Sequence, residues 1–205
     1  MVANVFGIAA FFVVYFWVLN HRFFDAFEIP LTPLDRWIAF QPAALVIYYS
    51  LWLYVSLPLA LLTRTQELAR FGAGALTLTA AGMVIFIVWP TTTPAFQIDW
   101  SQHPAFIFLK DFDASGNACP SLHVAFAIFA AVWLQRLLRE MRAGLAIEIA
   151  NAVWCAAIVY STLATRQHVV IDVVAGAALG FAIVRANLLH LPAIEPAPSP
   201  ASHDG

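Results

Sequence analysis

Six apolar stretches follow one another along the 205-residue chain, and each is long enough to form a helix across a membrane. The hydrocarbon core of a bilayer is about 30 Å thick, so a helix needs roughly 20 mostly apolar residues to cross it. The stretches lie at residues 2–20, 43–62, 71–89, 120–138, 145–164 and 168–189. Polar segments such as "NHRFFD", "TRTQELAR", "WPTTTP" and "RLLREMRAG" predict helix ends between them. The sequence therefore predicts an all-α fold, a bundle of six transmembrane helices.

The composition supports a membrane-embedded protein and excludes several other classes. Of the residues, 62% are hydrophobic and 11% are charged, whereas soluble domains have about 45–50% apolar and about 25% charged residues. The formal net charge is -2 and the basic residues form no long run, so we expect no nucleic-acid partner. Two cysteines are too few for a disulfide framework or a thiolate metal cluster.

The domain organisation is simple. We see no internal repeat, and six spans leave room for one domain, at residues 1–190. The first stretch has no basic residue before it and no small-residue cleavage site, which favours a retained span over a signal peptide. Residues 191–205 are rich in Pro, Ala and Ser, and we expect them to form a disordered tail.

The basic residues predict how the chain is oriented. The short connections after the second and fourth stretches carry Arg64, Arg70, Arg136, Arg139 and Arg142, and the longer ones after the first and third carry Arg22, Arg36 and Lys110. Basic residues in short loops favour the cytoplasmic side. We therefore expect both termini in the cytoplasm, loops 21–42, 90–119 and 165–167 facing outward, and a location in the cell membrane.

The third connection is long for a small bundle and contains "HPAFIFLK" at residues 103–110. Phe106 and Phe108 in a segment of this length suit a short interfacial helix, because aromatic rings favour the headgroup level of a membrane. Two interpretations stay open: a hydrophobic plug, or a lid and dock for a lipid tail.

A first polar motif, "ACPSLHVAF", lies at the start of the fourth stretch. Pro120 suits the first position of a helix, where its missing N–H costs nothing, and Ser121 and His123 follow within the first turn. A helix N-terminus with unpaired N–H groups binds anions readily, which favours a phosphate site. The alternative is a capped helix end with a histidine in the membrane interface.

A second motif, "TRQHVVIDVVAG", starts the sixth stretch and contains Arg166, His168 and Asp172. Because His168 and Asp172 are four apart, we expect them to share a helix face, with the carboxylate accepting a hydrogen bond from one ring nitrogen. That arrangement orients a nucleophile or base. A carboxylate inside a span costs about 2.5–3.5 kcal/mol on insertion scales and is usually functional.

Other interpretations of the second motif also stay open. The His–Asp pair can tie helices together without chemistry, or His168, Asp172 and His123 can supply three metal ligands. No further carboxylate or histidine has an obvious place in such a metal set. A channel or transporter favours polar groups at mid-membrane depth or broken helices, whereas both motifs lie at outer helix ends.

Together, "PSLH" and the later H-x3-D resemble the second and third signatures of the type 2 phosphatidic acid phosphatase superfamily, in order and about 45 residues apart. The usual family forms are P-S-G-H and S-R-x5-H-x3-D, with K-x6-R-P as first signature. Here Leu122 replaces the glycine, Thr162 replaces the arginine, and no K-x6-R-P occurs. These departures resemble the branch that includes inositol phosphorylceramide synthases and related bacterial proteins.

The resemblance implies roles for particular residues. It places the phosphohistidine-forming nucleophile on His168, its orienting carboxylate on Asp172 and the leaving-group acid on His123. It places a phosphate contact on Ser121 and makes Arg166 the best candidate for charge neutralisation. Because a dianionic phosphate usually needs more than one cation, Lys110 or Arg36 is a further candidate, although either can simply anchor at headgroup level.

These inferences predict a metal-independent phosphatase or phosphotransferase without a cofactor. Its substrate would be a lipid or polyprenyl phosphoester at the outer membrane face, because a soluble phosphate does not need a site so close to the hydrocarbon. A lipid headgroup transferase is the alternative, and a non-enzymatic membrane scaffold or metal-binding protein is less favoured. The headgroup, the acceptor and the oligomeric state stay open.

Overall fold

The computed structural model describes residues 13, 15, 17–18, 21, 23–106, 109 and 117–189. Five of its helical segments are long and apolar enough to cross a membrane: Ala44–Leu61, Thr65–Val88, Leu122–Glu140, Leu145–Ala164 and Val170–Leu188. They correspond to the second to sixth predicted stretches. Most of the first predicted stretch, 2–20, and the predicted tail lie outside the described residues. The protein is therefore a mostly helical, multi-pass membrane protein.

The element bounds are as follows. The helices of the bundle are α3 (Ala44–Tyr49), α4 (Leu51–Leu61), α5 (Thr65–Val88), α7 (Leu122–Glu140), α8 (Leu145–Ala164) and α9 (Val170–Leu188). The short elements are β1 (Phe27–Glu28), α2 (Pro33–Trp37), β2 (Thr91–Thr92) and the 3-10 helix η1 (Trp100–Gln102). Ser50 separates α3 from α4, and its hydroxyl donates to the carbonyl of Ile47 at 2.6 Å.

Two predicted helix ends are wrong because charged residues there are paired. α5 begins at Thr65 rather than at residue 71. Glu67 in its first turn lies 3.6 Å from Arg64 and 3.8 Å from Arg136. α7 continues to Glu140 rather than ending at 138, and Glu140 lies 2.7 Å from Arg136. Acidic side chains favour the first turn of a helix and form pairs between turns, so these charges extend helices that they were expected to end.

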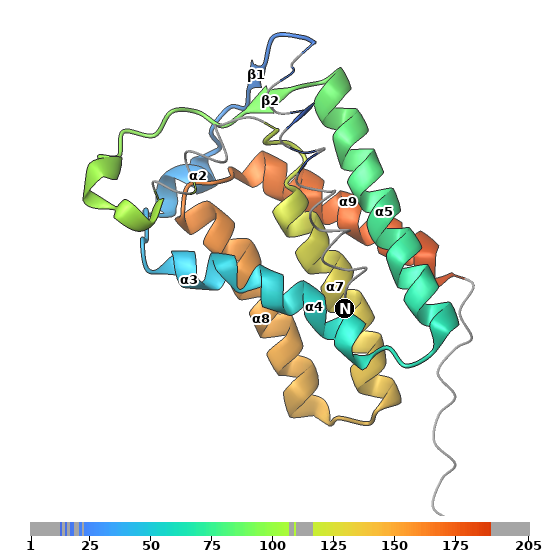
Figure 1. Cartoon of the computed structure of the whole chain (residues 1–205). Coiled ribbons are helices and arrows are strands. Elements are labelled where there is room, and N and C mark those ends of the chain that lie inside the picture. The colour runs from blue at the N-terminus through green and yellow to red at the C-terminus, as the bar shows by residue number, and fades with distance from the viewer. Residues whose placement is uncertain are drawn as a thin grey trace, which may run out of the picture.

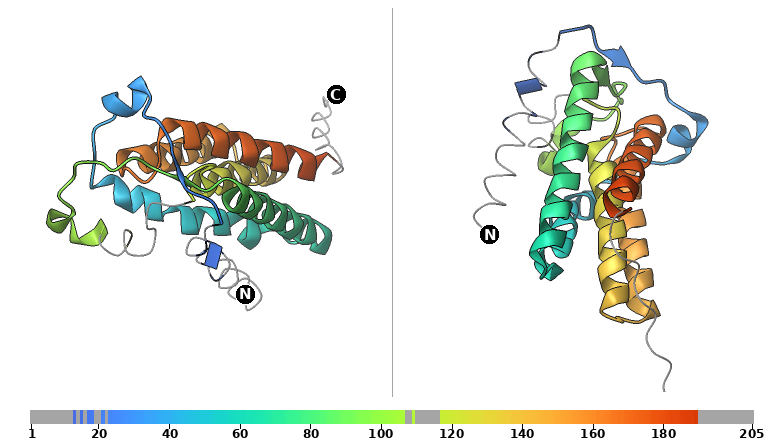
Figure 2. Two further views of the ribbon diagram at one scale, coloured as in Figure 1. Left: turned by 90° about the horizontal axis from the view of Figure 1, so that it is seen from above. Right: turned by 90° about the vertical axis from the view of Figure 1, so that its right-hand side faces the viewer.

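α7 lies at the centre of the bundle, in contact with α4, α5, α8 and α9. One apolar core joins α7 to α5 and α9 around Phe129 and Trp133. A second core joins α7 to α4 and α8 around Tyr54 and Ile158. Figure 1 and the right-hand view of Figure 2 both show α5 running past α7 and α9. The helix that carries the first motif is thus packed on several sides.

Two glycines bring α9 against the start of α7. A side chain at Gly176 would overlap the carbonyl oxygen of Ser121, and one at Gly180 would overlap that of Ala125. Small residues four apart let two helix backbones approach closely inside a membrane. The contact places the N-terminal ends of α7 and α9, and with them both motifs, side by side.

The first, third and fifth connections meet at one end of the bundle, as the orientation prediction requires. β1 pairs in parallel with β2, Phe27 opposite Thr91, and the Gln41 N–H donates to the carbonyl of Ala164 at 2.8 Å. Figure 1 shows α2, β1 and β2 at this end, which we call the site end because both motifs lie there. Which membrane face it meets stays a prediction.

The third connection is described only in part. Residues 104–106 are helical, and Phe106, which is 1% exposed, packs with Leu45 and Tyr48. Lys110 and Phe108 lie outside the described residues. The predicted interfacial helix therefore stays a prediction, although its first turn is anchored on α3.

Candidate active site

The first motif forms the N-terminus of α7. Ser121 is the N-cap, and its hydroxyl oxygen accepts a hydrogen bond from the Val124 N–H at 3.2 Å. Pro120 precedes this cap, so its predicted place as the first helical residue is wrong by two positions. The Ser121 N–H donates to the main-chain carbonyl of Asp172 at 3.0 Å, and Ser121 is completely buried. One backbone bond therefore ties the first motif to the second.

The second motif forms the N-terminus of α9, whose N-cap is Val169. Oδ2 of Asp172 lies 2.8 Å from Nδ1 of His168, and its Oδ1 accepts from the Val169 N–H at 3.0 Å. The predicted His–Asp hydrogen bond is present, but His168 precedes the helix, so the two residues do not share a helix face. Asp172 bends back over the helix start, as an N-terminal carboxylate does when it satisfies free N–H groups.

The Asp172 carboxylate fixes the tautomer of His168. An ionised carboxylate can only accept hydrogen bonds, so Nδ1 of His168 carries the proton in this contact. In the neutral ring, Nε2 then keeps its lone pair. The backbone N–H of His168 donates to the carbonyl of Thr162 at 3.1 Å. The carboxylate thus holds the imidazole and the Thr162 carbonyl holds the backbone of His168, which leaves one ring nitrogen able to attack an electrophile.

His123, in the first turn of α7, is held by a residue of α3. Its Nε2 lies 3.1 Å from the main-chain carbonyl oxygen of Tyr48, and the two rings stack with centroids 3.9 Å apart and planes 13° from parallel. A carbonyl only accepts, so Nε2 is the donor and Nδ1 is the nitrogen left for other partners. The bond from the Ser121 N–H to the Asp172 carbonyl places His123 at the same end of the bundle as His168.

Arg166 is engaged by the protein backbone. Its Nη1 donates to the carbonyl of Asp35 at 2.8 Å and its Nη2 to that of Ile38 at 2.5 Å. The guanidinium lies over the ring of Phe96, 4.8 Å from the centroid. Arg166 therefore fastens α2 to the loop before α9, a function in the fold that the sequence did not indicate.

Asp35 fastens the same region from the other side. It is 2% exposed, its Oδ2 accepts from the Thr32 N–H at 2.7 Å, and its Oδ1 accepts from the Val170 N–H at 2.8 Å. The start of α9 thus has two of its N–H groups bound by carboxylates, those of Asp35 and Asp172. An incoming anion would meet negative charge there, so the N-terminus of α7 is the better anion site.

Asn117, four residues before Ser121, is a candidate site residue that sequence reasoning missed. It is 4% exposed and has the left-handed φ of 56° that asparagine tolerates. Its side-chain nitrogen and oxygen are buried without a hydrogen-bond partner among the described residues. Its place four residues before Ser121 was the only signal available in the sequence. Buried amides in native proteins nearly always have partners, so this one calls for an explanation.

Cys119 lies beside the site but is unsuited to act as a nucleophile. Burial, and next the negative charge of Asp172, raise the pKa of the Cys119 thiol to about 11. The thiolate is the reactive form of cysteine, and almost none is present at neutral pH under such a pKa. His168 is therefore the better nucleophile of the two.

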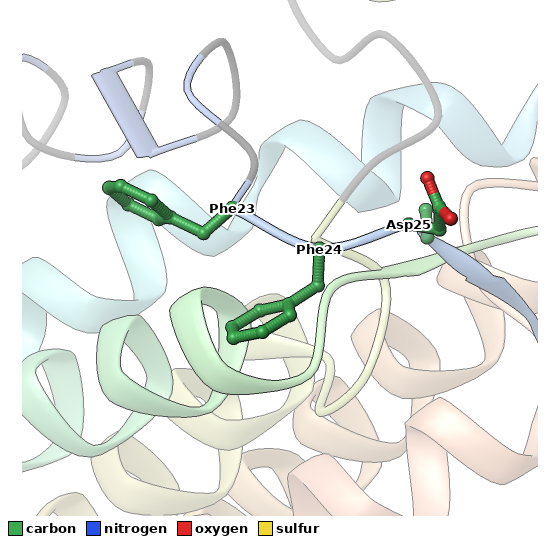
Figure 3. Close-up of a pocket in the computed structure, with 4 residues that line it drawn as sticks. Phe23, Phe24 and Asp25 are labelled. Atoms are coloured by element: carbon green, nitrogen blue, oxygen red, sulfur yellow. The ribbon is translucent and has the colours of Figure 1, made fainter.

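Two observations limit where else a site can lie. Among the described residues, no three His, Cys, Asp or Glu side chains are placed to hold a metal ion. A surface hollow lies at Phe23, Phe24, Asp25 and Ala26, where Figure 3 shows the labelled side chains diverging from the loop. No residue of either motif lines it, so this hollow is not the site that the motifs form.

The fold and the site define a helical membrane protein with two histidines and a buried carboxylate at one end of its bundle. The family model described as PAP2 superfamily matches residues 14–186, and the chain belongs to this superfamily. The resemblance seen in the motifs is therefore confirmed, and the protein is in general terms a membrane phosphoesterase. Neither a curated protein nor a solved structure matches the chain.

Proposed function

We propose that the protein is a metal-independent phosphatase or phosphotransferase that acts on a lipid or polyprenyl phosphoester through a phosphohistidine. The observation that carries the proposal is the 2.8 Å contact between His168 Nδ1 and Asp172 Oδ2, which leaves Nε2 as a nucleophile. Positioned His–carboxylate pairs of this kind activate and orient the ring that attacks or takes up a proton. The reaction takes place at the site end of the bundle, facing outward in the predicted orientation.

The first step forms the phosphoenzyme. The lone pair of His168 Nε2 attacks phosphorus, and the bond from phosphorus to the substrate alcohol breaks. Positive charge that develops on the His168 ring is stabilised by Asp172, and Nδ1–H of protonated His123 gives its proton to the departing alkoxide. Nε2 of His123 is committed to Tyr48 at 3.1 Å, which leaves Nδ1 for this transfer.

The second step regenerates the enzyme. Water or a second alcohol attacks phosphorus, His123 takes its proton, and the bond from phosphorus to His168 breaks. Water gives a phosphatase, and an alcohol gives a phosphotransferase. A lipid headgroup transferase runs through the same residues if a phospho-headgroup rather than a phosphoryl group is carried on His168.

The phosphate would bind at the start of α7. The first N–H groups of a helix have no acceptor within it and favour anions, and the buried Ser121 lies at this end. Arg166 and Lys110 were the predicted cations. Because Arg166 donates to the carbonyls of Asp35 and Ile38, its charge acts on the phosphate from a fixed position while it holds the loop.

The test is phosphate release by the purified protein in detergent from a panel of lipid and polyprenyl phosphates, with and without excess chelator. We expect release from at least one substrate, unchanged by the chelator, because electrostatic preorganisation can supply the stabilisation in phosphoryl transfer. Loss of release with chelator would favour the metal interpretation. If the protein releases no phosphate and also transfers no headgroup between lipids, the interpretation as a non-enzymatic membrane scaffold would be favoured.

A second prediction concerns Asn117, which we propose donates its side-chain amide to the bound phosphoester. Replacing Asn117 with glycine keeps the left-handed backbone and removes the amide. We expect kcat/KM to fall about 10- to 100-fold, since a hydrogen bond to a charged group contributes about 1.5–3 kcal/mol. The thermal midpoint without substrate should stay near the wild-type value. A lowered midpoint with unchanged kcat/KM would assign the amide to folding instead.

A further inference from the structure

We infer that Tyr48 is the positioning residue of the leaving-group acid: its ring and its carbonyl together hold His123 so that Nδ1 delivers the proton. The inference rests on the proposed function and deepens it. Tyr48 belongs to neither motif and lies 75 residues before His123 in the chain. It therefore adds to the site a residue from the second predicted span.

Two independent contacts restrict the His123 imidazole. Stacking at 3.9 Å and 13° fixes the plane of the ring, and the 3.1 Å contact from Nε2 to the Tyr48 carbonyl fixes its rotation within that plane. A ring with its plane and its rotation set can present only one nitrogen to the substrate. That nitrogen is Nδ1, because a carbonyl can only accept and so keeps the other proton on Nε2.

The charge state that an acid requires is also favoured by Tyr48. An acid must hold two ring protons before it gives one up, so the imidazolium is the active form of His123. The face of a tyrosine ring carries partial negative charge and attracts a cation stacked on it. A leucine at this position would supply neither the charge nor the flat face.

Tyr48 is itself firmly held. It is 6% exposed and packs with Leu45, Phe106 and Leu109, and α3 packs against α8. The position of the His123 ring thus depends on α3 and on the third connection, as well as on its own helix. Precise placement of a proton donor matters, because small misplacements of a catalytic group cost large factors in rate.

The experiment measures how the rate depends on the leaving group. Phenyl phosphates with substituents from hydrogen to nitro, each with an alkyl chain, are hydrolysed in detergent by the wild type and by Tyr48→Phe, Tyr48→Leu and Tyr48→Met. The slope of log kcat/KM against leaving-group pKa is then compared. This slope does not depend on the fraction of folded enzyme, so partial misfolding of a variant cannot mimic the result.

For Tyr48→Leu and Tyr48→Met we expect kcat/KM to fall about 10- to 100-fold with the poorest leaving group. This loss is part of the roughly 10²–10⁴-fold that general acids contribute to the rate. With nitrophenol, which departs without a proton, we expect kcat/KM to change by less than about threefold. Tyr48→Phe should keep the wild-type slope, because ring and carbonyl remain. Tyr49→Leu, a half-buried neighbour in α3, is the matched control and should keep it too.

A double variant separates positioning from a structural effect. In a His123→Ala background, Tyr48→Leu should lower the rate by less than about twofold. The effects of the two substitutions are not additive if both residues act through one proton transfer. An unchanged slope in both Tyr48→Leu and Tyr48→Met, an additive double variant, or loss of all activity in both would overturn the inference alone. A wild type inactive on every ester would instead remove the proposed function, and the inference with it.

Discussion

Replacing His168 with alanine is expected to lower phosphoryl transfer by about 10⁴-fold or more, since loss of a covalent nucleophile has effects of this size in other enzymes. The imidazole is buried, and its Nδ1 is bound to Asp172 at 2.8 Å, so the change removes Nε2, the nitrogen proposed to attack phosphorus. The measurements are kcat/KM and radiolabelling from substrate phosphate. The wild type should form a label that survives alkali and is lost in acid, and His168→Ala should form none.

The matched control for this experiment is His21→Ala. His21 is exposed, stacks on Trp17 at 4.8 Å and lies in neither motif, so its removal should leave both the rate and the label intact. A labelled His168→Ala protein would contradict the nucleophile assignment. Equal and mild losses in His168→Ala and His123→Ala would contradict the division of roles between the two histidines.

The second large effect is expected for Asp172→Asn, which preserves shape but changes what the side chain can accept. The carboxylate accepts from His168 Nδ1 and from the Val169 N–H, and an amide has only one oxygen for these two donors. If its NH₂ faces His168, the ring must place its proton on Nε2 and lose the attacking lone pair. We expect kcat to fall about 10⁴-fold, as when the carboxylate of a catalytic triad is changed in this way.

The control for Asp172→Asn is Asp35→Asn, a second buried carboxylate at the same helix start. Asp35 accepts from the Val170 N–H at 2.8 Å, and no hydrogen bond joins it to a histidine in the described part of the chain. We expect it to lower the thermal midpoint about as much as Asp172→Asn does while reducing kcat by less than about 10-fold, since it disturbs only a hydrogen-bonded helix start. Similar kcat losses in both variants would show that helix anchoring, not the tautomer of His168, decides activity.

Hydropathy predicted the helices well where chain length and apolar content decide the outcome. The stretches predicted at 43–62 and 145–164 form Ala44–Leu61 and Leu145–Ala164. The predicted start of α5 at residue 71 is wrong because Glu67, in the first turn of the helix, forms ion pairs with Arg64 and Arg136. A charged residue that is paired fits within a helix, and a partner on another helix, such as Arg136, cannot be seen in the sequence.

Local spacing along the chain predicted the part of the site that lies within one segment. The His168–Asp172 bond was expected from a separation of four residues, and it formed although the geometry is that of a capped helix start. Arg166 is a predicted cation for the phosphate, but the sequence did not indicate that its guanidinium also donates to carbonyls 128 and 131 residues away. Nothing in its neighbours along the chain indicates these partners.

A multi-span helical membrane protein, its superfamily and the His168–Asp172 pair could all be predicted from the sequence, because apolar length and short-range spacing act within single segments. The stacking of Tyr48 on His123, the bonds from Arg166 to α2, and the burial of Asn117 without a partner among the described residues depend instead on the folded chain. These contacts depend on how closely helices approach. That approach is set by packing, such as Gly176 against the Ser121 carbonyl, and many sequences with the same hydropathy pattern would pack differently.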